Sequence, residues 1–152
     1  MSKFIKYIYL MIFSIITVVI ILSSLKNADL SLKDSDLVTD VIVQIGSKKD
    51  KNVISSFVRN VIGHFGSFFL CGIFSFLTIN SFFKKRIKAM IIIMTIGILL
   101  SVGSELLQLI PKGRHCDYKD MLVNISGYVS SILIFLFISF IKVKSKKEKL
   151  LS

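Results

Sequence analysis

The chain has 152 residues, of which 53% are hydrophobic and only 19% are charged, and its formal net charge is +11. A composition this apolar is typical of an integral membrane protein and argues against an ordinary soluble domain. Lys and Arg residues lie at the ends of long uncharged segments, as in proteins whose membrane topology is set by charge, which argues against nucleic-acid binding. We therefore expect one membrane domain covering residues 1–152.

Four apolar segments are long enough to cross a bilayer, which takes about 20 residues. They cover residues 7–25, 60–83, 89–110 and 121–141. The sequence thus predicts an all-α bundle of four transmembrane helices. The first segment has a basic start and also fits a signal peptide, but its apolar core is long for one and no clear cleavage site follows. We expect it to be a retained helix.

The distribution of basic residues predicts that both termini are cytoplasmic. Lys3 and Lys6 precede the first segment, a basic block at 84–88 separates the second from the third, and the lysines of 142–149 follow the fourth with only Glu148 opposing them. Acidic residues are mixed with basic ones at 26–59, so this longer loop should lie outside, together with 111–120. The expected protein is a multi-pass protein of the cell membrane.

The outer loop, residues 26–59, contains a helical pattern of apolar residues. Leu37, Val41 and Ile45 recur at helical spacing, and so do Val38 and Ile42. This spacing predicts a short amphipathic helix on the outer surface. The alternative is a partly ordered, solvated loop.

Polar residues that are costly inside a membrane occur at a single depth in the predicted bundle. His64, Glu105 and Asn124 each lie four or five residues from the outer end of their segment, which is roughly 6–9 Å at 1.5 Å per residue. Ionisable groups within membrane helices require partners. We therefore expect Glu105 to pair with Arg114 or His64, and Arg114 to reach Asp120.

Helical spacing also gathers polar side chains on one face of each predicted helix. The three stripes are Ser101, Glu105 and Gln108; Asp120, Asn124 and Gly127; and His64, Ser67 and Cys71. If these faces turn inward, the stripes meet in one outward-facing polar site. The alternative is that the polar pairs only hold helices together, although small-residue pairs already offer a packing device. Those pairs are Gly63 and Ser67, Gly97 and Ser101, and Gly127 and Ser131.

The polar cluster carries no recognisable signature of catalysis or of a metal site. No Ser or Cys has the setting of a nucleophile, so no catalytic residue is assigned. His115, Cys116 and Asp117 are too closely spaced for a typical zinc site, and we expect neither a metal nor a cofactor. Cys71 falls within an apolar segment and Cys116 within a loop, so a disulfide between them is not expected.

Two segments resemble the VanZ-like family of small bacterial membrane proteins. In RNVIGHFGSFFLCG, residues 59–72, the matching residues are Arg59, His64, Phe65 and Gly72, whereas Ser67, Phe68 and Cys71 replace the usual Glu, Tyr and Leu. In SELLQLIPKGRHCDYKDMLVNISG, residues 104–127, the matches are Glu105, Gln108, Pro111, Gly113, Arg114, Asp120, Asn124 and Gly127, with Lys112 inserted between Pro and Gly. The resemblance extends over nearly the whole chain.

The resemblance implies a role at the cell envelope, because the family takes its name from a member associated with teicoplanin resistance. We expect an outward-facing site that binds an envelope lipid, a cell-wall lipid intermediate or a lipophilic glycopeptide. Its residues would be Arg59, His64, Glu105, Gln108, Arg114, Asp120 and Asn124. Arg59 and Arg114 would bind phosphate or carboxylate, with Asp120 holding Arg114. The alternatives are an intramembrane enzyme acting on a lipid-linked substrate and a structural or partner-binding membrane protein.

Overall fold

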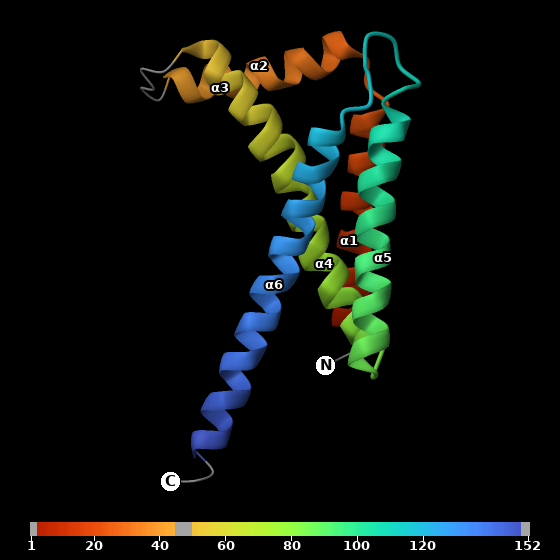
Figure 1. Cartoon of the computed structure of the whole chain (residues 1–152), viewed down its shortest axis with the longest axis vertical. Coiled ribbons are helices and arrows are strands. Elements are labelled where there is room, and N and C mark those ends of the chain that lie inside the picture. Colours follow the sequence, from red (N-terminus) through yellow and green to blue (C-terminus); the bar gives the residue numbers. More distant parts are fainter. Residues whose placement is uncertain (1–2, 45–49, 150–152) are drawn as a thin grey trace.

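The computed structural model describes residues 3–44 and 50–149, and all the regular structure in this part of the chain is helical (Figure 1). The elements are α1 (Lys3–Ser24), α2 (Ala28–Gln44), α3 (Lys51–Phe57), η1 (Val58–Gly66), α4 (Ser67–Phe82), α5 (Arg86–Leu107) and α6 (Tyr118–Lys149). The π-helical segment η1 joins α3 and α4 into one continuous helix. Four helices are long and apolar enough to cross a membrane, which confirms the predicted fold class.

The membrane-spanning helices differ from the apolar segments at their ends, because backbone hydrogen bonding continues through polar residues. The second spanning helix begins at Lys51 rather than at residue 60, and the Asp50 side chain caps it by accepting a hydrogen bond from the Asn52 amide at 3.0 Å. α6 begins at Tyr118, where the Asp117 carboxylate accepts from the Lys119 amide at 2.8 Å. α5 ends at Leu107, ahead of the expected residue 110.

The two ends of the bundle differ in shape (Figure 1). At one end, called the α2 end here, α2 runs across the bundle and the α5–α6 loop covers α1 and α5. The predicted amphipathic helix is thus present up to Gln44, and Ile45 lies outside the described residues. α1 begins and α6 finishes at the opposite end, called the termini end. That the termini end is cytoplasmic stays a prediction.

The core of the bundle is organised around Tyr128 on α6, whose side chain is almost completely buried. The Tyr128 hydroxyl donates to the Ile93 carbonyl oxygen of α5 at 2.9 Å and lies 2.6 Å from Ser75 Oγ of α4. A Cβ at Gly97 would lie 2.4 Å from the Tyr128 ring, so the glycine makes room for it. The aromatic side chain therefore connects three spanning helices through both packing and hydrogen bonds.

Gly127 allows η1 and α6 to approach closely at the depth of the polar residues. A Cβ at this position would lie only 2.4 Å from the Phe65 carbonyl oxygen, which is far inside contact distance. Ser131, one turn further along α6, is fully buried. Of the small-residue pairs predicted to pack helices, the pair of Gly63 on η1 and Ser67 on α4 differs, because Gly63 is exposed. The Gly127 contact places the residues of η1 directly beside the start of α6.

Candidate functional site

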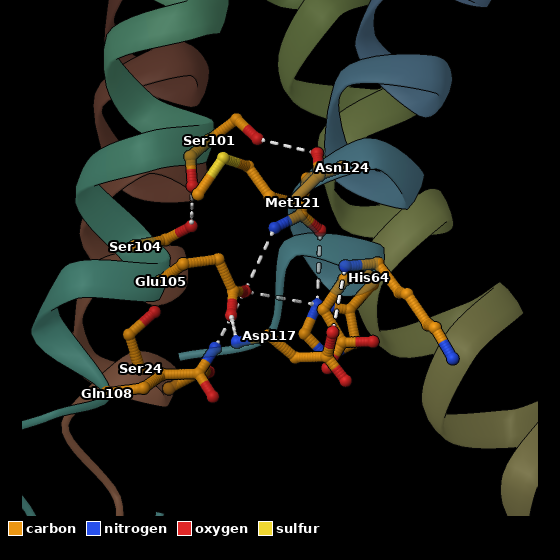
Figure 2. Close-up of polar contacts among 12 residues, drawn as sticks. Ser24, His64, Ser101, Ser104, Glu105, Gln108, Asp117, Met121 and Asn124 are labelled. Carbon is orange, nitrogen blue, oxygen red and sulfur yellow. Dashed lines mark hydrogen bonds and ion pairs between the residues drawn. The ribbon is translucent and has the colours of Figure 1, made fainter. Parts of the chain in front are cut away.

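Polar side chains from η1, α5 and the start of α6 meet at the α2 end of the bundle. Figure 2 shows Glu105 reaching from α5 toward Gln108, Asn124 and His64. The predicted site residues all belong to this cluster or to the cavity beside it. Members of all three expected stripes, His64, Asn124 and the pair Glu105 and Gln108, therefore do face one another.

Glu105 is the centre of the cluster, and its side chain is completely buried. Its Oε1 accepts hydrogen bonds from Gln108 Nε2 at 2.7 Å and from Asn124 Nδ2 at 3.3 Å. Its Oε2 accepts from the backbone amide of Asp117 at 3.4 Å. A buried carboxylate is tolerated only when it is paired and hydrogen-bonded. Three donors contact the Glu105 carboxylate, and no hydrogen-bond acceptor does so among the described residues. This pattern suits the ionised form, which can only accept hydrogen bonds.

Gln108 connects Arg114 to Glu105. Its Oε1 accepts from Arg114 Nη2 at 2.6 Å and from Nε at 3.1 Å. Because a guanidinium can only donate, the Gln108 oxygen must face Arg114 and its NH₂ group must face Glu105. The expected pairing of Arg114 with Glu105 therefore passes through an amide and is not a direct ion pair. The alternative partner, His64, does approach Glu105, with its Nδ1 3.8 Å from Oε1.

Arg114 also ties the α5–α6 loop to the first spanning helix, because its Nη1 lies 3.4 Å from the Ser23 carbonyl oxygen near the end of α1. Burial lowers the pKa of the Arg114 guanidinium, and the nearby Glu105 carboxylate acts in the opposite direction. Arginine stays protonated in proteins in either case, so a fixed positive charge lies beside the buried carboxylate.

The orientation of Asn124 determines which nitrogen of His64 carries a proton. Asn124 presents its NH₂ group to Glu105, so its Oδ1, 3.1 Å from His64 Nδ1, must accept a hydrogen bond from the imidazole. His64 is therefore protonated at Nδ1. Its other nitrogen, Nε2, faces Asp120 Oδ2 at 3.5 Å.

Asp120 lies between His64 and Arg59, which corrects the expectation that it holds Arg114. Its Oδ2 is 3.6 Å from Arg59 Nη2 as well as 3.5 Å from His64 Nε2. The reason is that Arg114 is kept on the α1 and α5 side of the cluster by Gln108 and Ser23. The Arg59 side chain is 49% exposed, and Asp120 is its one ion-pair partner among the residues that the structure describes.

The π-helical segment explains how Arg59 and His64 reach the same carboxylate. They are five residues apart, and a π-helix bonds residue i to residue i+5, whereas an α-helix bonds residues four apart. Residues five apart therefore lie close to one face of η1 and both turn toward Asp120 on α6. No spacing in the sequence signalled this segment, and π-helical turns occur frequently at functional sites.

A half-open cavity of about 250 Å³ lies beside the cluster, between α1, α2, η1 and α5. One part of the cavity wall is polar. The residues of the polar cluster that line it are Arg59, His64, Glu105, Gln108, Arg114 and Asn124. Another wall is apolar and includes Val19 and Ile20 of α1 and Ile62 of η1. Ser67, which stands where the VanZ-like pattern has Glu, also lines the cavity.

The contributions of α1 and α2 to this cavity were missed by sequence reasoning. Ser31, Asp34 and Val38 of α2 line it from the end of the bundle. Lys26, which also lines it, pairs with Asp34 at 2.5 Å and so connects the end of α1 to α2. The charges of Lys26 and Asp34 were visible in the sequence, but their pairing depends on the position of α2.

The other candidate ligands of the sequence lie outside the cluster. His115 is exposed in the α5–α6 loop, and Cys116 and Cys71 are free thiols. Among the residues that the structure describes, no group of three His, Cys, Asp or Glu side chains is arranged to hold a metal ion. Asp117 caps α6 with its side chain and contributes its backbone amide to Glu105.

Comparison with known proteins identifies the family of this chain. Residues 5–139 match the VanZ/LLP1 family, a match that includes most of every spanning helix and every residue of the polar cluster. No curated protein and no solved structure gives a significant match. The family match covers most of the chain, and four helices are suited to cross a membrane. The chain is therefore a multi-pass membrane protein that belongs to the VanZ/LLP1 family.

Proposed function

We propose that this VanZ-family protein binds an anionic amphiphile of the cell envelope in the cavity at its α2 end, without chemical conversion. The ligand classes are an envelope lipid, a cell-wall lipid intermediate and a lipophilic glycopeptide such as teicoplanin. The observation that carries the proposal is the pairing of two different walls around one cavity. One wall holds two guanidinium groups, and the other is built from apolar side chains of membrane-spanning helices.

Arg59 is the residue best suited to bind the anionic group. A guanidinium has five N–H donors in a planar fork that matches phosphate or carboxylate. In this cluster Arg59 has one charged partner at 3.6 Å and a half-exposed side chain. Arg114, in contrast, uses its donors on Gln108 and on the Ser23 carbonyl oxygen. Arg114 therefore positions Gln108 and Glu105, while Arg59 is free to bind.

The apolar wall gives a hydrocarbon chain a lateral path into the bilayer. α1 packs mainly along α4, whereas η1 packs against α6. The first spanning helix, α1, and the second, which runs from α3 through η1 to α4, therefore diverge toward the α2 end, and the cavity lies between them there (Figure 1). Val19 of α1, Ile62 of η1 and Val38 of α2 line the cavity and are exposed. A headgroup beside Arg59 can therefore keep its acyl chain in the membrane.

The proposal is tested by comparing Arg59→Gln with Lys112→Gln, which removes an exposed charge at the same end that does not line the cavity. Purified full-length protein in detergent is titrated with a polyprenyl phosphate, with teicoplanin and with zwitterionic phosphatidylcholine, and bound species are counted by native mass spectrometry. Loss of a charge-assisted hydrogen bond, worth about 1.5–3 kcal/mol, should weaken binding of the anionic ligand about tenfold or more in Arg59→Gln alone.

Equal affinity for all ligands, or equal losses in the two variants, would overturn the proposal. In cells, the teicoplanin susceptibility of strains expressing the wild type and both variants is compared at matched membrane abundance. A shift that requires Arg59 but not Lys112 supports a glycopeptide-linked role. A binding defect without any shift in susceptibility restricts the function to lipid recognition.

An intramembrane enzyme acting on a lipid-linked substrate is the second candidate, and one observation favours it. His64, which lines the cavity, donates from Nδ1 to Asn124 while its Nε2 faces Asp120, as in a general acid–base. This function requires a mass change in the added lipid that disappears in His64→Ala. An unchanged lipid recovered at full yield after prolonged incubation excludes it.

A further inference from the structure

A second cavity, of about 530 Å³, lies at the termini end of the bundle, opposite the polar cluster. Side chains from all four spanning helices line it, among them Lys6 of α1, Asn80 of α4, Arg86 of α5 and Ser139 of α6. It forms where α6 diverges from the other spanning helices toward its C-terminal end (Figure 1). It shares no residue with the cavity at the α2 end.

The charged residues that line this cavity in the described part of the chain are all positive. They are Lys6, Lys84 and Arg86, and no acidic residue is among the described lining residues. Among the side chains that the structure describes, no carboxylate forms an ion pair with any of the three. Lys6 Nζ lies 5.8 Å from the centre of the Phe82 ring, which holds the ammonium group near the cavity wall. Three like charges around one cavity favour an anionic occupant.

The start of α5 adds to this positive field. α5 begins at Arg86, and its N-cap residue Lys85 makes no side-chain hydrogen bond to the first turn. The first amides of a helix have no partner within the helix, and its N-terminus carries a partial positive charge. The helix start therefore reinforces the three cationic side chains.

The rest of the cavity wall is hydrocarbon. Phe76, Phe83, Met90 and Leu136 contribute apolar surface next to the cations. All four residues belong to spanning helices or to the short connection between α4 and α5, and the three cations lie near the ends of these helices. A soluble phosphate compound would leave this apolar surface unused, whereas a phospholipid would cover it.

We propose that the cavity at the termini end is a binding site for an anionic phospholipid, with its phosphate between Lys6, Lys84 and Arg86 and an acyl chain along the apolar wall. Basic pockets between transmembrane helices are suited to anionic lipid headgroups. This site is independent of the ligand proposed at the α2 end. If the termini are cytoplasmic, the lipid belongs to the inner leaflet.

The sequence itself offers a matched control, because the same basic block contains cations that do not line the cavity. Lys84→Gln with Arg86→Gln removes two cavity cations, and Lys85→Gln with Lys88→Gln removes two neighbours that are exposed outside it. Both double variants change the net charge equally. Full-length protein in neutral detergent is titrated with phosphatidylglycerol, phosphatidylcholine and inorganic phosphate, with native mass spectrometry and the melting temperature as readouts.

Phosphatidylglycerol should bind and raise the melting temperature, and the cavity variant should weaken this binding about tenfold or more, at roughly fivefold per cation. The control variant should change it less than about threefold. The charge-conserving pair Lys84→Arg with Arg86→Lys should retain binding, and a melting temperature of the unliganded cavity variant equal to that of the wild type excludes misfolding as the cause of a loss. Equal losses in both double variants would show diffuse attraction and overturn the proposal. So would binding of inorganic phosphate or phosphatidylcholine as tight as that of phosphatidylglycerol.

Discussion

Replacing Glu105 by Gln tests whether the cluster is built around an ionised, acceptor-only group. The change keeps the size of the side chain but converts one of its two acceptor atoms into a donor. An NH₂ group in the place of Oε1 would face Gln108 Nε2 at 2.7 Å and Asn124 Nδ2 at 3.3 Å, and in the place of Oε2 it would face the Asp117 amide at 3.4 Å. Either orientation leaves donors opposed.

The neighbouring amides cannot turn to relieve this conflict. Gln108 is held by Arg114, which only donates, and Asn124 can turn only if His64 moves its proton from Nδ1. The less unfavourable orientation of the introduced Gln side chain places its NH₂ group at the Oε2 position. It loses the hydrogen bond from the Asp117 amide, and the bonds from Gln108 and Asn124 are then made to a neutral oxygen. Hydrogen bonds to charged groups contribute about 1.5–3 kcal/mol, so we expect Glu105→Gln to lower the free energy of unfolding by about 2–3 kcal/mol.

The assay is reversible chemical unfolding in detergent micelles, followed by circular dichroism. Ser104→Ala serves as the control, because it removes another buried polar group whose single bond is to the Ser101 carbonyl oxygen within α5. Its expected cost is about 1 kcal/mol or less. If Glu105→Gln unfolds within about 0.5 kcal/mol of the wild type, the side chain is satisfied in a neutral form and the derived orientations of Gln108 and Asn124 are wrong.

The remaining predictions concern packing, the binding residue and topology. Gly127→Ala should destabilise the fold by about 1–3 kcal/mol, because its methyl group would meet the Phe65 carbonyl oxygen; a stability equal to that of the wild type in the same unfolding assay would contradict the close approach of η1 and α6. Arg59→Gln should change the unfolding free energy by less than about 1 kcal/mol, since its ion pair is long and half exposed, so a larger loss would indicate a structural role instead. A membrane-impermeant maleimide applied to intact cells should label Cys116, in the loop predicted to lie outside, but not the fully buried Cys71. Labelling of Cys116 only after lysis would reverse the predicted topology.

Apolar length and helical spacing were enough to predict the four spanning helices and the polar stripes on three of them. These features are local, because a run of about 20 apolar residues can be satisfied in a bilayer only as a helix, and residues three or four apart always share its face. Glu105, Gln108 and Asn124 were therefore identified from spacing alone. Helix ends were predicted less well, because caps such as Asp50 and Asp117 extend helices beyond their apolar segments.

The choice of partners within the cluster depended on how the helices approach and rotate. Gly127 sets the distance between η1 and α6, and the π-helical turns of η1 bring Arg59 and His64 to Asp120. Gln108 comes between Arg114 and Glu105 because the α5–α6 loop folds back over the end of α5. Spacing along a single helix carries no information about these distances between elements. For the same reason the wall that α1 and α2 contribute to the cavity appeared only once the helices were packed together.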